Sequence, residues 1–203
     1  MGRVSMVNGR GYLAVIGVLG AQRIVEASWS ARNLRRSGPA PTASPETFPA
    51  MVLANAALFV APAITRYGRR RPHPGVQAGA ALALAGAVAL RLWVIRTLGA
   101  QWNVRAAVPA DMEPVTGGPY RWVRHPNYVA VAVEFAALPV LGGGYAEALA
   151  LSVANAAVLR SRIRAEERLL DAIPAYRRAF AGVPRFLPRR PAPCAQTRPS
   201  DQP

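Results

Sequence analysis

A short polar segment, GPYRWVRHPNY at residues 118–128, interrupts two apolar stretches of the chain. Pro126 suits the first position of a helix, so His125 adjoins a helix N-terminus. The free backbone N–H groups and the dipole at such an end attract a carboxylate or phosphate. Arg121, Arg124 and His125 add donors around it. The segment therefore predicts an anion-binding cradle.

The same segment also fits an interfacial turn at a membrane surface. In that interpretation its arginines extend toward lipid headgroups, and Tyr120, Trp122 and Tyr128 form an aromatic belt. The residues by themselves leave both interpretations open.

Two adjacent carboxylates, Glu166 and Glu167, lie in a run dominated by arginine. Neighbours on a helix point about 100° apart, so the two side chains need different partners. Surface pairing with Arg162 or Arg164 is the ordinary outcome for one of them and stabilises little. The other glutamate is then free to face a site.

Two further carboxylates, Glu26 and Glu134, lie inside apolar segments. Ionisable groups at membrane depth usually face a bundle interior or a cavity and mark function. Arg23 and Glu26 share one helix face. Glu134 is expected to act as a general base or to orient a substrate; the alternative is a structural pair with Arg23 or Arg91.

The composition points to a membrane protein built only from helices. The chain has 203 residues, of which 52% are hydrophobic and 17% are charged. Its 25 basic residues are all arginine and are scattered through apolar segments, which disfavours a nucleic-acid partner. Cys194 is the single cysteine, and His73 and His125 are far apart, so no metal site is expected.

The apolar runs predict an all-α bundle of about five membrane helices. These helices are expected at residues 11–29, 48–64, 76–98, 128–141 and 145–159. The last two runs are too short to cross a hydrocarbon core of about 30 Å alone and predict a short helical hairpin.

The remaining segments complete a single domain, residues 1–188. Residues 99–127 form the loop that carries the polar segment. The charged, amphipathic residues 160–188 predict a C-terminal helical cap that breaks near Pro174. The Pro-rich residues 189–203 predict a disordered tail.

Arginine placement predicts a multi-pass protein of the cell membrane with the polar segment facing the cytoplasm. The loop Arg66–Arg71 then falls on the opposite side, which conflicts with the positive-inside rule. A cleaved signal peptide is the alternative for residues 11–29, but Arg23 and Glu26 favour a retained membrane helix.

Other motifs follow the polar segment in a fixed order. Gly-Pro-Tyr-Arg and Arg-His-Pro-x-Tyr are followed by AEERLL at residues 165–170, Tyr176, and PRFLP at residues 184–188. Together they resemble the isoprenylcysteine carboxyl methyltransferase superfamily, small integral membrane enzymes that use S-adenosylmethionine. The resemblance covers roughly residues 99–188.

The N-terminal half extends the resemblance. RIVEASWSARN at residues 23–33 and FPAMV at residues 48–52 are similar to a bacterial subgroup. Its members O-methylate long-chain alkylpyrones and alkylresorcinols made by type III polyketide synthases. The resemblance implies an S-adenosylmethionine-dependent O-methyltransferase whose lipid-like acceptor enters from the bilayer.

The resemblance also implies roles for individual residues. The cradle takes the cofactor carboxylate, and Glu166 or Glu167 holds its ribose, adenine or ammonium group. The expected cofactor contacts are Gly118, Pro119, Tyr120, Arg121, His125, Pro126, Asn127, Tyr128, Glu166 and Glu167. The expected catalytic residues are Glu134, Arg124 and Glu26, with His125 a further candidate base.

Two other functions fit the same residues. A relative of these enzymes could methylate a prenylcysteine-type carboxylate or a phospholipid amine instead. A membrane scaffold could keep the clamp without turnover, although retention of both halves of the clamp argues against that function.

Overall fold

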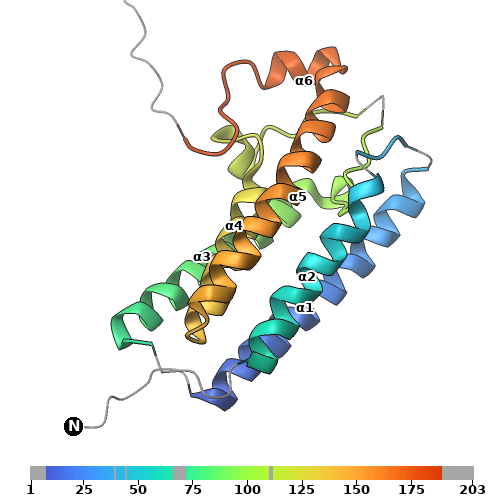
Figure 1. The fold of residues 1–203 in the computed structure, drawn as a ribbon. Coiled ribbons are helices and arrows are strands. Elements are labelled where there is room, and N and C mark those ends of the chain that lie inside the picture. The colour runs from blue at the N-terminus through green and yellow to red at the C-terminus, as the bar shows by residue number, and fades with distance from the viewer. Residues whose placement is uncertain (1–7, 39, 44, 66–71, 110–111, 189–203) are drawn as a thin grey trace, which may run out of the picture.

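A computed structural model describes residues 8–38, 40–43, 45–65, 72–109 and 112–188 (Figure 1). Over these ranges the chain is helical and contains no strand, apart from an isolated bridge between Thr42 and Ala107. The all-α prediction is therefore confirmed for the described residues. The predicted tail and the Arg66–Arg71 loop lie outside them.

Long helices form the body of the molecule (Figure 1). They are α1 (Gly9–Arg36), α2 (Phe48–Thr65), α3 (Pro74–Leu98), α4 (Pro126–Leu141) and α5 (Tyr145–Asp171), followed by the short α6 (Pro174–Ala179). Three 3₁₀ turns, η1 (Pro45–Thr47), η2 (Gly99–Gln101) and η3 (Gly118–Arg121), lie in the connections.

Two helices are longer than predicted. Helix α1 continues to Arg36, beyond the predicted end at residue 29. Helix α5 continues to Asp171, which joins the expected second hairpin helix to the first part of the expected cap. Residues 145–171 contain neither Gly nor Pro, so nothing in this stretch stops the helix. The predicted break occurs at Pro174, the first residue of α6.

Helix starts follow from local sequence. The Asn8 side chain accepts a hydrogen bond of 2.8 Å from the Gly11 N–H and caps α1. Helices α3, α4 and α6 each begin with a proline, which lacks the N–H that a first helical residue leaves unpaired. Pro126 thus occupies the predicted first position of α4.

The α4–α5 hairpin packs closely against α1. The Tyr12 hydroxyl donates a hydrogen bond of 3.0 Å to the Leu138 carbonyl. A Cβ at Gly142 would lie 2.4 Å from the Tyr12 ring, so this turn has no room for a side chain. Tyr12 also belongs to the main core, which includes Leu58, Leu84, Phe135 and Leu138.

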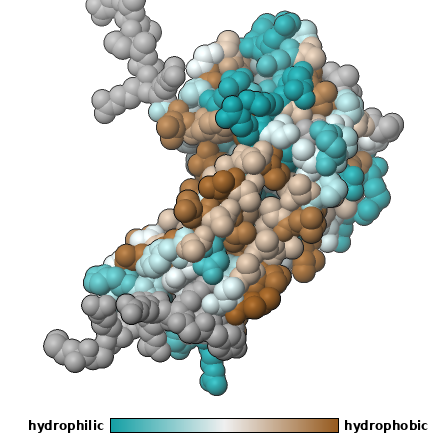
Figure 2. All heavy atoms as spheres, viewed as in Figure 1, coloured by the Kyte–Doolittle hydropathy of each residue, from teal (hydrophilic) through white to brown (hydrophobic). Residues whose placement is uncertain are grey.

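The outer surface of the bundle is suited to a membrane. Among the described residues, Pro45–Thr65 and Pro74–Gln101 are long and apolar enough to cross one, with mean hydropathies of 1.7 and 1.9. Ile24, Leu82 and Leu149 are exposed on three helices. Figure 2 shows hydrophobic residues along the helix shafts and hydrophilic residues gathered at the end that carries α6.

Three connections meet at the end that carries α6: the α1–α2 linker, the α3–α4 loop and the chain after α5 (Figure 1). The linker and the loop are joined by hydrogen bonds from Ala43 N to Ala106 O, 3.1 Å, and from Val108 N to Pro41 O, 2.9 Å. The fold therefore brings the polar segment, the α5 glutamates and the C-terminal residues together.

Candidate active site

A cavity of about 360 Å³ lies inside this end of the bundle. That volume is within the usual range for small-molecule sites. Side chains from α1 through α6 and the α3–α4 loop line the cavity. Polar residues of the loop and α5 lie together with apolar residues of α2, α4 and α5, among them Met51, Val52, Val131 and Leu159.

One polar contact in the cavity joins the sequence motifs that are far apart in the chain. The Tyr128 hydroxyl on α4 donates to the Glu166 carboxylate on α5. Both residues line the cavity, together with Tyr120, His125 and Asn127. The segment RHPNY and Glu166 of the Glu-Glu pair therefore meet at one site.

Two tyrosines near Glu166 remain neutral hydrogen-bonding groups. Burial raises the pKa of Tyr120, and the Glu166 carboxylate raises it further. Burial also raises the pKa of Tyr176 against the opposing effect of Arg124. Both phenols line the cavity and keep their protons at physiological pH, so they can donate to a ligand.

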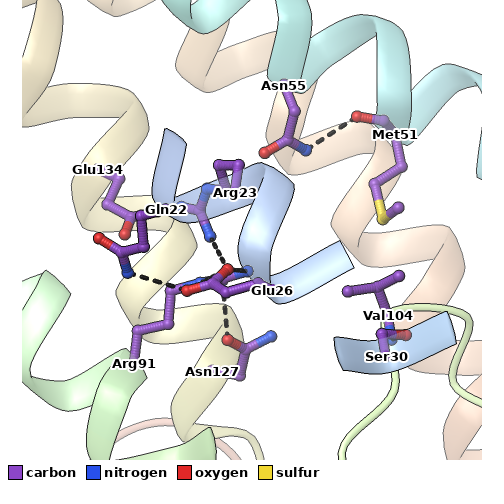
Figure 3. A network of polar contacts seen from close by, with 10 residues as sticks. All are labelled: Gln22, Arg23, Glu26, Ser30, Met51, Asn55, Arg91, Val104, Asn127 and Glu134. Carbon is purple, nitrogen blue, oxygen red and sulfur yellow. Dashed lines mark hydrogen bonds and ion pairs between the residues drawn. The ribbon is translucent and has the colours of Figure 1, made fainter. Parts of the chain in front are cut away.

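A buried charge network lies on the α1 side of the cavity (Figure 3). The Glu26 carboxylate accepts from Arg91 Nε at 2.7 Å, Gln22 Nε2 at 2.9 Å and Arg23 Nη1 at 3.1 Å. Arg91 Nη1 also donates to Asn127 Oδ1 at 3.0 Å. The network thus connects α1 and α3 directly to the polar segment.

Glu134 belongs to this network but does not line the cavity. Its carboxylate is paired with Arg23, as the structural alternative predicted. Arg23 does line the cavity and lies between the two carboxylates Glu26 and Glu134 (Figure 3). Of the three predicted catalytic residues, Glu26 and Arg124 face the cavity, and Glu134 reaches it only through Arg23.

Glu167 points away from the cavity into a cluster of basic side chains. Its carboxylate lies 3.2 Å from His125 Nε2, 2.7 Å from Arg185 Nη2 and 3.6 Å from Arg124 Nη2. Glu167 is buried and is absent from the cavity lining. The expected surface pairing of a glutamate with Arg162 or Arg164 does not occur among the described ion pairs.

The same cluster fastens the C-terminal residues over the polar segment. The Arg124 and His125 N–H groups donate to the carbonyls of Pro184 and Arg185, at 2.9 and 3.0 Å. The Phe186 ring lies 6.0 Å from the His125 ring. Two predicted donors of the cradle, Arg124 and His125, are therefore engaged by PRFLP and Glu167.

Five predicted cofactor contacts lie outside the cavity lining: Gly118, Pro119, Arg121, Pro126 and Glu167. Gly118 has φ +55°, and a Cβ there would lie 2.4 Å from Thr97 Oγ1, so glycine allows η3 to pack on α3. Arg121 is exposed and lies over the Trp122 ring at 4.0 Å. Pro119 and Pro126 are buried. The exposed Arg121 and Trp122 match the interfacial interpretation, whereas Tyr120 and Tyr128, which line the cavity, match the cradle interpretation.

The sequence interpretation missed polar residues of the cavity. Arg162 is 3% exposed and lines it, yet its Nε and Nη1 have no hydrogen-bond partner. Trp102 Nε1 and Arg124 Nε are likewise buried and unpartnered. On α5 the lining residues are Asn155, Leu159, Arg162, Glu166 and Leu170. Their helical spacing is a sequence signal that could have placed Arg162 beside Glu166.

Among the described residues, no group of three or more His, Cys, Asp or Glu side chains is arranged to hold a metal ion. Cys194 lies outside the described ranges.

Residues 80–172 match the sequence model of the Isoprenylcysteine carboxyl methyltransferase (ICMT) family. The chain is also 38% identical over 93 residues to Uncharacterized protein YpbQ of Bacillus subtilis (strain 168). That alignment covers 46% of this chain and 55% of the relative, so the chain spans about half the length of the relative. The family match supports the predicted resemblance to the isoprenylcysteine carboxyl methyltransferase superfamily.

Proposed function

We propose that the protein is an S-adenosylmethionine-dependent O-methyltransferase of the membrane. Its acceptor is the phenolic or enolic hydroxyl of a long-chain alkylpyrone or alkylresorcinol. The observation that carries this proposal is a single cavity lined by Tyr128 and Glu166 of the family-matched region and by the Glu26 network of α1.

The end of the cavity near α6 suits the methyl donor. Glu166 offers a carboxylate for a ribose hydroxyl, an amine or an ammonium group, and Tyr120 and Tyr176 offer neutral hydroxyls beside it. The unpartnered Trp102 N–H adds a buried donor with no acceptor in the protein. S-adenosylmethionine bound here supplies a methyl group on a positively charged sulfur.

The α1 side of the cavity suits the acceptor head. Glu26 is placed to accept a hydrogen bond from an acceptor hydroxyl and would take its proton as the oxygen bonds to the methyl carbon. The carbon–sulfur bond of the bound donor would break in the same step, and its electron pair would stay on the sulfur of S-adenosylhomocysteine. Arg23 and Arg91 hold the carboxylate in position. Alignment of two bound reactants supplies much of the rate in such a displacement.

Two other predicted catalytic residues have supporting roles in this proposal. Arg124 lines the cavity next to His125 and is fixed by Glu167. Glu134 fixes Arg23, which in turn holds Glu26, so Glu134 is a positioning residue. His125 contacts Glu167, and in this proposal it lies beside the bound methyl donor.

The acceptor tail follows the apolar wall of α2. Phe48, Met51 and Val52 line the cavity, and Val52 is 48% exposed on the outside of the bundle. Ala27 of α1 also lines the cavity and is exposed. A long alkyl chain can therefore leave the cavity between α1 and α2 and lie in the bilayer.

The proposal includes a single domain, residues 1–188, that crosses the cell membrane several times. The end that carries α6 then faces the cytoplasm, where a water-soluble donor is available. The arginines of the linker, the α3–α4 loop and the C-terminal region support this orientation.

Methyl transfer by the purified protein in detergent tests the proposal. Labelled S-adenosylmethionine is supplied with an alkylresorcinol, an alkylpyrone, phosphatidylethanolamine or a farnesylcysteine analogue, and the product is identified by mass spectrometry. We expect O-methylation of the first two acceptors, lost in Glu166→Gln and kept in the exposed control Arg164→Gln. Transfer only to phosphatidylethanolamine or the farnesylcysteine analogue would contradict the acceptor, and transfer to none would contradict the enzyme.

A further inference from the structure

One face of α5 lines the cavity, and it contains an arginine that has no ion-pair partner. Arg162 lies one turn from Glu166, and both line the cavity. Nη2 of Arg162 donates to the Val104 carbonyl at 2.9 Å, whereas Nε and Nη1 have no partner. None of the ion pairs between described residues includes Arg162.

A buried guanidinium without an anion is unusual, because removing a charge from water is costly unless an opposite charge or hydrogen bonds compensate. The other buried arginine of the cavity, Arg91, has Glu26 at 2.7 Å and the Asn127 amide oxygen at 3.0 Å. Arg162 has one carbonyl oxygen and the neutral Tyr128 hydroxyl, and no carboxylate pairs with it among the described ion pairs. The difference indicates that the compensating anion of Arg162 is supplied by a ligand.

The neighbouring cations do not compete for this role. Arg124 and His125, the predicted anion cradle, already share the Glu167 carboxylate with Arg185. The unpartnered donors of the lining are Trp102 Nε1, Arg124 Nε, and Nε and Nη1 of Arg162. Arg124 already has the Glu167 carboxylate, so Arg162 is the arginine among these that offers two free donors and has no carboxylate partner.

We propose that Arg162 binds an anionic oxygen of a ligand in the cavity, an inference that rests on the proposed methyl transfer. The oxygen belongs either to the carboxylate of the methyl donor or to the ionised hydroxyl of the acceptor. With Glu166 one turn away, the pair also suits a group that carries both charges, such as an α-amino acid.

Binding measurements in detergent separate the two sources. Arg162→Gln removes the charge, Arg162→Lys retains it, and the exposed Arg164→Gln on the same helix is the matched control. The ligands are S-adenosylhomocysteine and 5′-methylthioadenosine, which lacks the amino-acid carboxylate. If Arg162 holds the donor carboxylate, Arg162→Gln weakens S-adenosylhomocysteine at least about tenfold, Arg162→Lys weakens it less, and neither changes 5′-methylthioadenosine.

Unchanged binding of S-adenosylhomocysteine with an acceptor KM raised at least about tenfold would support the acceptor oxygen instead. If Arg162→Gln leaves both quantities at the wild-type value, the proposal is wrong. Absence of any wild-type binding or turnover would contradict the methyltransferase. In that case thermal unfolding with dodecanoate, a carboxylate with an alkyl tail, tests the anion site at Arg162. Dodecanoate should raise the unfolding temperature of the wild type but not of Arg162→Gln, and equal shifts in the two proteins would overturn the proposal.

Discussion

Two buried carboxylates, Glu26 and Glu167, are each surrounded by basic side chains, but their surroundings differ. Glu167 fastens one loop and the C-terminal residues together through Arg124, His125 and Arg185, away from the cavity. Glu26 lines the cavity and joins α1 to α3 through Arg91. Glu167, the carboxylate of the motif region with the most ion-pair partners, therefore lies behind the cavity lining and not in it.

The two clusters also differ in their relation to the family match. Glu167 lies within residues 80–172, whereas Glu26 lies before them. In the proposed function the matched region holds the methyl donor and the Glu26 network outside it selects the acceptor. The following predictions separate these two roles.

The largest expected effect is on stability at Glu167. Glu167→Ala leaves the buried His125 and the two arginines without their carboxylate, and breaking a buried ion pair costs about 3–5 kcal/mol. We expect a large fall in the unfolding temperature in detergent. Glu113→Ala, at an exposed glutamate, is the control and should change little. Equal stabilities of the two variants would show that the Glu167 cluster does not stabilise the fold.

The next effect is on turnover at Glu26. Glu26→Gln removes the proposed proton acceptor but keeps hydrogen-bonding atoms for Arg23 and Arg91, so turnover should fall about a hundredfold. Affinity for S-adenosylhomocysteine should stay near the wild-type value. Glu134→Gln should lower turnover less, because Glu134 acts through Arg23. A larger loss in Glu134→Gln than in Glu26→Gln would reverse these roles.

A smaller loss is expected where η3 packs on α3. Gly118→Ala places a Cβ 2.4 Å from Thr97 Oγ1 at φ +55°, and overpacking of this kind typically costs about 1–3 kcal/mol. Gly117→Ala is the matched control, because a Cβ there meets nothing within 4 Å. Thermal unfolding of both variants measures the difference. If Gly117→Ala is as destabilised as Gly118→Ala, close packing on α3 is not the reason for the glycine.

The smallest effect belongs to Arg185. Its side chain is 58% exposed, so its pair with Glu167 is screened by water, and Arg185→Ala should cost less than about 1 kcal/mol. His125 and Arg124 remain to compensate Glu167. Denaturant unfolding compares Arg185→Ala with the exposed Arg168→Ala. A loss as large as that of Glu167→Ala would mean that Arg185 alone holds the C-terminal residues.

The sequence predicted the helices well because apolar runs and prolines act locally. Pro126 and Pro174 begin helices where their missing N–H groups cause no loss. The predicted division of residues 145–171 at residue 159 is wrong, because α5 continues through the change from apolar to charged residues near Arg160. A change of polarity alters what a helix contacts but does not end it.

The site was harder to predict because orientation around a helix depends on packing. The meeting of Tyr128 with Glu166 followed from the motifs. The direction of Glu167 did not, since it depends on the later residue Arg185 folding back over His125. Arg162 was interpreted as a surface partner, and only the assembled cavity shows that it is buried and unpartnered.

The division of the cavity into a donor end and an acceptor end is tested most directly by calorimetric binding of S-adenosylhomocysteine to the wild type, Glu166→Gln and Glu26→Gln. We predict that the wild type binds and that Glu166→Gln binds at least about tenfold more weakly, since a hydrogen bond to a charged group is lost. Glu26→Gln should bind like the wild type. Unchanged binding by Glu166→Gln, or an equal loss in Glu26→Gln, would contradict the division.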